Sequence, residues 1–162
     1  MASAPHSPTP ISGLYSPEER VRRDSTFWTL VQGVLAPLQF VVFLVSLALV
    51  LRYLASGAGY DAATLSIVLK TAILLLIMVT GAIWEKVVFG QWLFAPAFFW
   101  EDVMSFAVIA LHLGYVWALW TGLPPATQMW IALAAYAAYV VNAVQFVLKL
   151  RAARLQERGA PA

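Results

Sequence analysis

Four long apolar stretches dominate the chain, and each is long enough to cross a lipid bilayer as a helix. A hydrocarbon core of roughly 30 Å takes about 20 helical residues. The chain has 162 residues, of which 62% are hydrophobic and 11% are charged, a composition far from that of soluble proteins. We therefore predict an all-α integral membrane protein, a bundle of about four transmembrane helices in a single domain over residues 16–155. The predicted spans are approximately residues 27–51, 62–84, 103–123 and 129–148.

The two ends of the chain differ from these stretches. Residues 1–15 are rich in Pro, Ser and Ala, which predicts a disordered N-terminal tail, and residues 156–162 are expected to form a flexible C-terminal tail. Ser16, Pro17 and Glu19 have the spacing of a capping box with proline at the first helical position, so a short helix should precede the first span. No apolar run of signal-peptide length precedes residue 27, so we expect the first span to be a retained anchor.

The basic residues gather on one side of the predicted bundle. Of the ten Lys and Arg residues, eight fall in the two termini and the 85–102 connection, and one falls in the other two loops. Under the positive-inside rule, both termini are expected on the cytoplasmic side. We attribute the net charge of +2 to this orientation signal and expect no nucleic-acid binding. The sequence contains no cysteine, which excludes disulfides, thiol nucleophiles and c-type haem attachment.

Each predicted span carries a thin stripe of polar residues at helical spacing. Polar groups in a bilayer core are costly and usually face the bundle interior. Interhelical hydrogen bonds are the simpler explanation, and we favour it for the Gln, Ser and Asn side chains. A polar-lined interior that contacts a ligand is the alternative. The stripes are Gln32, Gln39 and Ser46; Ser66 and Lys70; Glu101, Ser105 and His112; and Asn142, Gln145 and Lys149.

The connection between the second and third spans is the most unusual segment. It holds seven aromatic residues between positions 84 and 100, is interrupted by Gly90 and Pro96, and is bracketed by the acids Glu85, Glu101 and Asp102. The segment could lie in the interface or re-enter the membrane. An aromatic belt at the membrane interface explains each tryptophan taken alone. It does not explain why three acids flank the same segment. Carboxyl groups crowded beside apolar rings can hold a proton near neutral pH, as a proton donor must.

Two ionisable residues fall inside predicted spans. His112 lies roughly 16 Å along the helix axis from Glu101, at 1.5 Å per residue, and should be deep in the bilayer. Three roles are open to it: a buried neutral side chain with one hydrogen bond, a proton-transfer group, or an axial ligand to a bound metal chelate. Lys70 could snorkel towards its helix end, and we expect no catalytic role for it. The sequence contains no H-E-x-x-H, Walker or di-iron motif, so we expect no metal held by the protein itself.

Five segments carry a resemblance to a known family: residues 14–20, 28–37, 81–86, 93–102 and 135–142. The most specific parts are Trp84-Glu85-Lys86 and the run from Phe98 to Asp102. Together these segments closely resemble the 3-vinyl bacteriochlorophyllide hydratase family of anoxygenic phototrophic bacteria. The resemblance extends from about residue 14 to residue 155, nearly the whole chain.

The resemblance implies addition of water to the C3 vinyl group of a Mg-chlorin or bacteriochlorin, which gives a 1-hydroxyethyl group on the way to bacteriochlorophyll a. Such a hydro-lyase needs an acid and a base but no redox cofactor, and Mg enters only as part of the tetrapyrrole substrate. The implied partners are that substrate, membrane lipid and other enzymes of bacteriochlorophyll synthesis. The implied location is the bacterial inner membrane, cytoplasmic or intracytoplasmic, with several passes.

We expect the site residues to form a catalytic group and a substrate-binding group. Glu101 or Glu85 is expected to be the acid, Asp102 or its neighbour to activate water, and His112 is a further catalytic candidate. Aromatic side chains of the connection are expected to pack on the tetrapyrrole ring. The substrate-binding candidates are Trp84, Lys86, Trp92, Phe98, Phe99, Trp100, Gln32, Gln39 and Asn142.

Two other classes of function are alternatives to a hydratase. A tetrapyrrole carrier or assembly factor of the photosynthetic membrane would use the same aromatic residues without needing three acids. A small four-helix efflux protein would need an acid in the middle of a span, whereas the acids of this chain lie at span ends.

Overall fold

The chain folds into five helices and forms no strand within residues 13–159, the part that the computed structural model describes. A short helix, α1 (Pro17–Ser25), precedes four long ones: α2 (Phe27–Ser56), α3 (Tyr60–Phe89), α4 (Phe99–Trp120) and α5 (Pro125–Gly159). Each of the four is long and apolar enough to cross a membrane. The predicted all-α membrane fold with four spans is confirmed.

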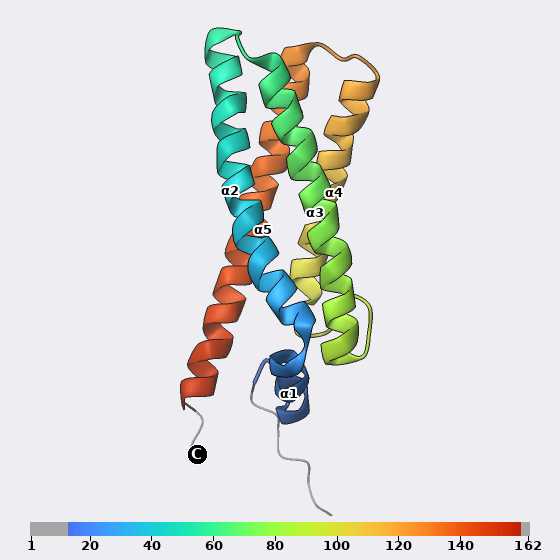
Figure 1. Cartoon of the computed structure of the whole chain (residues 1–162), viewed down its shortest axis with the longest axis vertical. Helices are drawn as coiled ribbons and strands as arrows, with labels where there is room; N and C mark the ends of the chain where they lie inside the picture. Colours follow the sequence, from blue (N-terminus) through green and yellow to red (C-terminus); the bar gives the residue numbers. More distant parts are fainter. Residues whose placement is uncertain (1–12, 160–162) are drawn as a thin grey trace, which may run out of the picture.

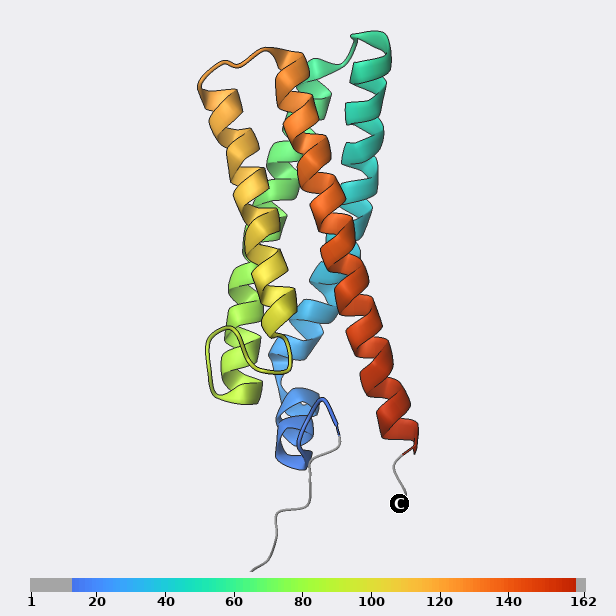
Figure 2. The ribbon, with the colours of Figure 1, turned by 180° about the vertical axis from the view of Figure 1, so that it is seen from behind.

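The long helices form two antiparallel hairpins, α2 with α3 and α4 with α5 (Figure 1). Helices within a hairpin pack extensively, whereas α2 meets α5, and α3 meets α4, over less of their length. We refer to the boundary between the two hairpins as the seam. The two hairpin turns lie at one end of the bundle, and α1, the end of α5 and the 90–98 connection lie at the other, which we call the loop end (Figure 2).

Glycines set where three of the long helices stop. α2 and α3 continue past the predicted spans until Gly57 and Gly90, each of which has a positive φ and caps the preceding helix. α4 ends at Trp120, and Gly122 also has a positive φ. The helix thus ends just before the approximate bound of position 123, because this glycine turn interrupts the apolar run.

The segment before α1 is ordered and partly buried. Tyr15 is only 3% exposed, and its ring stacks on Phe89 with 5.7 Å between ring centroids. Ser16 and Glu19 form the predicted capping box at the start of α1. The predicted disorder of residues 1–15 is wrong for residues 13–15, because the Tyr15 ring has an apolar surface to bury against. Residues 1–12 lie outside the described part of the chain.

The last turns of α5 dock on the N-terminal segment. Arg23 of α1 donates to a Glu157 carboxylate oxygen at 2.8 Å, and the backbone amide of Leu14 donates to Gln156 Oε1 at 3.2 Å. These contacts explain why α5 stays helical to position 159. The predicted flexible tail is therefore wrong for residues 156–159, and residues 160–162 lie outside the described part.

Two buried apolar clusters stabilise the bundle. The larger one lies around Phe43, whose ring packs on Tyr136 and Tyr139 of α5. Large apolar side chains are exposed on the outward faces of the long helices, as expected of surfaces in contact with lipid. The smaller cluster closes the loop end and consists of Tyr15, Val88, Phe98 and Ala153.

Candidate active site at the loop end

Two of the predicted acids hold the 90–98 connection in place. Glu85, near the end of α3, accepts a hydrogen bond from the Ala95 amide at 3.1 Å. Asp102, in the first turn of α4, accepts one from the Phe94 amide at 2.7 Å. Phe94 has a φ of 59°, a conformation that a bulky residue adopts only when its surroundings enforce it. The two carboxyl groups thus fold the connection back over the bundle end.

The Glu85 and Asp102 side chains also meet each other. Both are almost completely buried, at 5% and 4% exposure, and their carboxyl groups are close enough for their charges to interact. Neither forms a salt bridge within residues 13–159. Two carboxyl groups buried next to each other without a cation favour a proton on one of them, so the pair is suited to hold a proton.

The third acid, Glu101, has a different environment. Its Oε1 lies 3.2 Å from Nζ of Lys149 on α5, and Lys149 also donates to the Ala97 carbonyl at 2.7 Å. Its Oε2 is buried and has no hydrogen-bond partner in the described part of the chain. Glu101 is close enough to Asp102 for their charges to interact. The loop end therefore combines a pair of neighbouring buried acids with an ion-paired carboxylate, one oxygen of which has no partner among the described residues.

The predicted aromatic residues separate into two groups. Phe98 is buried beside the acids, and its ring lies 5.7 Å from that of Trp84, whose indole nitrogen donates to Thr29 at 2.9 Å. In contrast, Trp92 and Trp100 are 60% and 69% exposed. Phe99 is also exposed, at 41%. Among the predicted ring-packing residues, the contact between Trp84 and Phe98 therefore belongs to the buried cluster of the loop end, whereas Phe99 and Trp100 contact each other at the exposed surface.

Two of the remaining predicted binding residues, Lys86 and Gln32, form hydrogen bonds within or between helices. Lys86 is exposed and donates to the Gly90 carbonyl at 2.7 Å, across the end of α3. Gln32 donates to Thr80 at 2.8 Å and joins α2 to α3. Gln39 is buried in α2. These contacts fit the simpler explanation of polar stripes as hydrogen bonds within and between helices.

Asn142 has one structural hydrogen bond and one polar atom without a partner among the described residues. It donates to the Ser105 hydroxyl at 2.9 Å and joins α5 to α4 one turn of α4 above Glu101. Its Oδ1 is buried without a partner in the described residues. Asn142 therefore supports the hairpin and also leaves one polar atom available to a ligand.

Deeper in the bundle lies a second polar layer. His112 and Lys70 are both fully buried, and Lys70 Nζ lies 3.8 Å from the centroid of the Tyr139 ring. The idea that Lys70 snorkels was wrong, since its side chain packs over that ring instead of reaching the helix end. The structure therefore places His112 apart from the three acids and together with Lys70.

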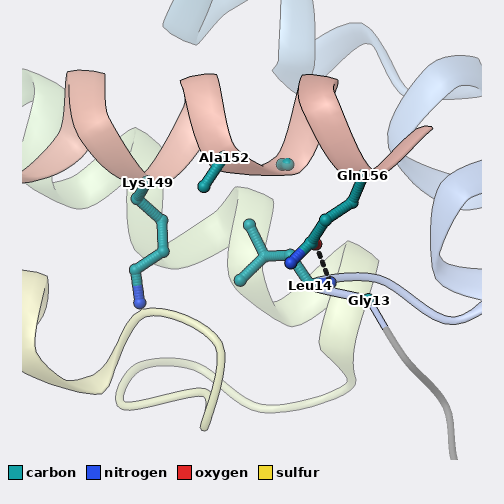
Figure 3. Close-up of a pocket in the computed structure, with 6 residues that line it drawn as sticks. Gly13, Leu14, Lys149, Ala152 and Gln156 are labelled. Carbon is teal, nitrogen blue, oxygen red and sulfur yellow. Dashed lines mark hydrogen bonds between the residues drawn. The ribbon is translucent and has the colours of Figure 1, made fainter. Parts of the chain in front are cut away.

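Lys149 belongs to one of the predicted polar stripes but is not among the predicted site residues. Lys149 also lines a cavity of about 580 Å³ between α5 and the N-terminal segment (Figure 3). Glu101 and Lys149 are far apart in sequence, so only the packing of α4 on α5 brings them together. Within the described residues, no group of three His, Cys, Asp or Glu side chains could hold a metal ion. The cavity is lined by Gly13, Leu14, Lys149, Ala152, Ala153 and Gln156.

Comparison with known proteins identifies one family and two relatives. The family described as 2-vinyl bacteriochlorophyllide hydratase matches residues 15–152. A 2-vinyl bacteriochlorophyllide hydratase of Rhodobacter capsulatus is 67% identical over 156 residues, which cover 96% of this chain and 91% of that protein. Another, of Cereibacter sphaeroides, is 68% identical over 157 residues, which cover 96% of this chain and 98% of that protein. No solved structure gives a significant match.

Proposed function

This chain belongs to the 2-vinyl bacteriochlorophyllide hydratase family, and we propose that it adds water to the vinyl group of a Mg-containing chlorophyllide or bacteriochlorophyllide. The observation that carries the proposal is the family match over residues 15–152, a range that includes all three acids of the loop end. The vinyl group named 2-vinyl in the family's description is the one named C3 vinyl above. The product carries a 1-hydroxyethyl group in its place.

The Glu85–Asp102 pair is suited to start this reaction as the acid. A proton delivered to the terminal vinyl carbon leaves positive charge on the carbon attached to the conjugated ring. The two carboxyl groups lie together in a buried site, and a carboxylic acid in such a site can donate a proton near neutral pH. We therefore assign the proton transfer to this pair of carboxyl groups.

Glu101 is suited to act as the base. Its Oε1 is ion-paired with Lys149, and its Oε2, which has no partner among the described residues, can accept a proton from the attacking water. The same negative charge stabilises the cation that forms beside the ring. Water adds to that cation, its proton passes to Glu101, and the hydroxyl group stays on the carbon next to the ring.

Aromatic side chains supply the surface for the flat ring. Trp84 and Phe98 pack beside the acids, and contacts of this kind contribute about 0.5–1.5 kcal/mol each beyond area burial. The exposed rings of Trp92 and Trp100 are suited to the membrane interface, where tryptophan is enriched. We propose that the pigment reaches the site from the membrane.

The remaining parts of the proposal concern cofactors and location. Hydration changes no net oxidation state, so the reaction needs no redox cofactor, and the substrate supplies its own Mg. The four apolar helices make this a membrane protein. We propose the bacterial inner membrane, with both termini cytoplasmic because the basic residues gather at the loop end. Other enzymes of bacteriochlorophyll synthesis are the partners we propose.

The experiment is to incubate the purified protein in lipid discs with the vinyl pigment and no added cofactor. We expect the pigment to gain the mass of one water, with a blue-shifted spectrum because the vinyl group leaves conjugation. Pigment that copurifies with the protein but keeps its mass would instead identify a carrier.

A further inference from the structure

Three buried oxygen atoms of α4 and α5 receive no hydrogen bond from any residue in the described part of the chain. They are Glu101 Oε2, Asn142 Oδ1 and Gln145 Oε1. The side chains of Glu101 and Asn142 are themselves buried, at 5% and 7% exposure. An ionised carboxylate and an amide oxygen can only accept, and a buried acceptor without a donor is costly. These oxygens therefore call for a ligand that supplies hydrogen-bond donors.

The orientation of the Asn142 amide follows from its neighbours. The Ser105 hydroxyl donates to the Glu101 carbonyl at 2.8 Å, so its single hydrogen is already used. Ser105 Oγ must then accept from Asn142 Nδ2, at 2.9 Å. The amide nitrogen is thus committed to Ser105, and the amide oxygen is the atom of Asn142 that remains for a ligand.

The register of α4 and α5 brings Gln145 to the level of Glu101. The two helices are antiparallel (Figure 2), and the hydrogen bond between Asn142 and Ser105 fixes how they are aligned. Gln145 lies three residues beyond Asn142, and Glu101 lies four before Ser105, both towards the loop end. At 1.5 Å per residue these steps are about 4.5 and 6 Å. Gln145 also lies between Asn142 and Lys149, which both contact α4.

Water has the chemistry that these acceptors require. It supplies two O–H donors, and buried waters typically make about three hydrogen bonds to polar groups that otherwise lack partners. A water takes up only about 30 Å³, far less space than a pigment needs. Because the surrounding protein atoms are acceptors, both hydrogens of a bound water point towards the protein. Its oxygen lone pairs are then free to attack a carbon atom.

We propose that Asn142 and Gln145, together with Glu101, bind the water that attacks the pigment. The inference rests on the proposed function, because this water is a substrate of the same reaction. One O–H donates to Glu101 Oε2, and the two amide oxygens share the other. As the bond from the water oxygen to the carbon forms, the first O–H bond breaks and its proton passes to Glu101. The two amides therefore hold and orient the water but take no proton.

The test is to run the reaction in heavy water and follow two products early in the reaction, with the full chain in lipid discs and the vinyl pigment. Hydrated pigment reports capture of the cation by water. Deuterium in the terminal vinyl carbon of recovered pigment reports cations that formed but lost a proton before water could add. Q145M and N142L should raise the ratio of exchange to hydration by about fivefold each, the effect of one lost hydrogen bond.

Gln128 provides the matched control. It is a buried amide at the opposite end of α5, and it is fully partnered, since it accepts from Tyr60 and donates to the Leu123 carbonyl. Q128M should keep the wild-type ratio even if it is less stable. Both products come from one sample, so the ratio does not depend on how much of a variant is folded.

Two outcomes separate this inference from the proposed function. A wild-type ratio in Q145M and N142L, whether or not both rates fall together, would overturn the inference, because a merely structural role lowers the two reactions equally. Wild-type protein that neither hydrates the pigment nor exchanges its vinyl hydrogens would contradict the function itself.

Discussion

Lys149 and Glu101 form an ion pair that joins α5 to the first turn of α4, with Nζ 3.2 Å from Oε1. The lysine also donates to the Ala97 carbonyl, so it ties the connection to both helices. The pair leaves Glu101 Oε2 unpartnered within residues 13–159. Lys149 thus positions the oxygen to which we assign proton transfer from water.

The first prediction concerns Glu101 itself. E101Q keeps the size of the side chain but removes its charge, so turnover should fall by roughly 10²-fold or more if the group is the base. Folding and pigment binding should persist, measured by thermal unfolding and by pigment titration. E18Q, at an exposed position of α1, is the control and should keep wild-type turnover. Unchanged turnover in E101Q would exclude the base role.

The second prediction concerns Lys149. K149M leaves the Glu101 carboxylate without its cation in a buried site, which should lower the free energy of unfolding by about 1–3 kcal/mol and reduce turnover. Because the lysine side chain is 28% exposed, we expect the effect to be smaller than for a fully buried pair. K149R retains the charge and should recover part of both losses. A K149M protein as stable and active as wild type would show that the ion pair has no role.

The third prediction concerns the Glu85–Asp102 pair. E85Q and D102N both keep an oxygen that can accept from the connection's backbone, so the loop should stay folded while turnover falls by roughly 10²-fold. If the two groups act as one acid, the double variant should be little worse than either single variant, because effects within one catalytic unit do not add. Initial rates of the three variants measure this. Fully multiplicative losses would show two independent roles.

The fourth prediction concerns the N-terminal segment. Tyr15 is buried against Phe89, and the Arg23 guanidinium lies 4.6 Å from the centroid of its ring. Y15A should therefore lower the free energy of unfolding by about 3 kcal/mol, measured by thermal or denaturant unfolding. V21A, at a position 68% exposed, is the control and should change stability little. A Y15A protein as stable as wild type would mean that residues 13–15 do not dock as described.

The fifth prediction concerns orientation in the membrane. The chain has no cysteine, so a single introduced cysteine shows which side of the membrane it faces, and no other residue of the protein is labelled. Q91C in the 90–98 connection should react with a membrane-impermeant maleimide only after the membrane is opened. A58C, between α2 and α3, should react in intact spheroplasts. The reversed pattern would place the loop end outside the cytoplasm.

The architecture and the local helix signals could be predicted because they depend on residues close in sequence. Four apolar runs indicated the membrane helices, and the spacing of Ser16 and Glu19 indicated the cap of α1. Composition misled at residues 13–15, because a single aromatic ring, Tyr15, docks on a surface formed by distant parts of the chain. Local composition carries no information about such a surface.

The candidate site was predictable only in part, for a related reason. The clustering of three acids was visible in the sequence, but their division into a buried neighbouring pair and a lysine-bound carboxylate depends on how the helices pack. Spacing alone also could not separate the buried ring of Phe98 from the exposed ring of Trp100, because the connection has no regular period. Packing between distant segments determines these features.

The most direct test of the account is the reaction in water labelled with heavy oxygen, run with wild type and with the triple variant E85Q/D102N/E101Q. We predict that wild type places the label on the carbon attached to the ring, and that the triple variant binds the pigment but forms no labelled product. Hydration by a folded triple variant at the wild-type rate would contradict the assignment of catalysis to these acids.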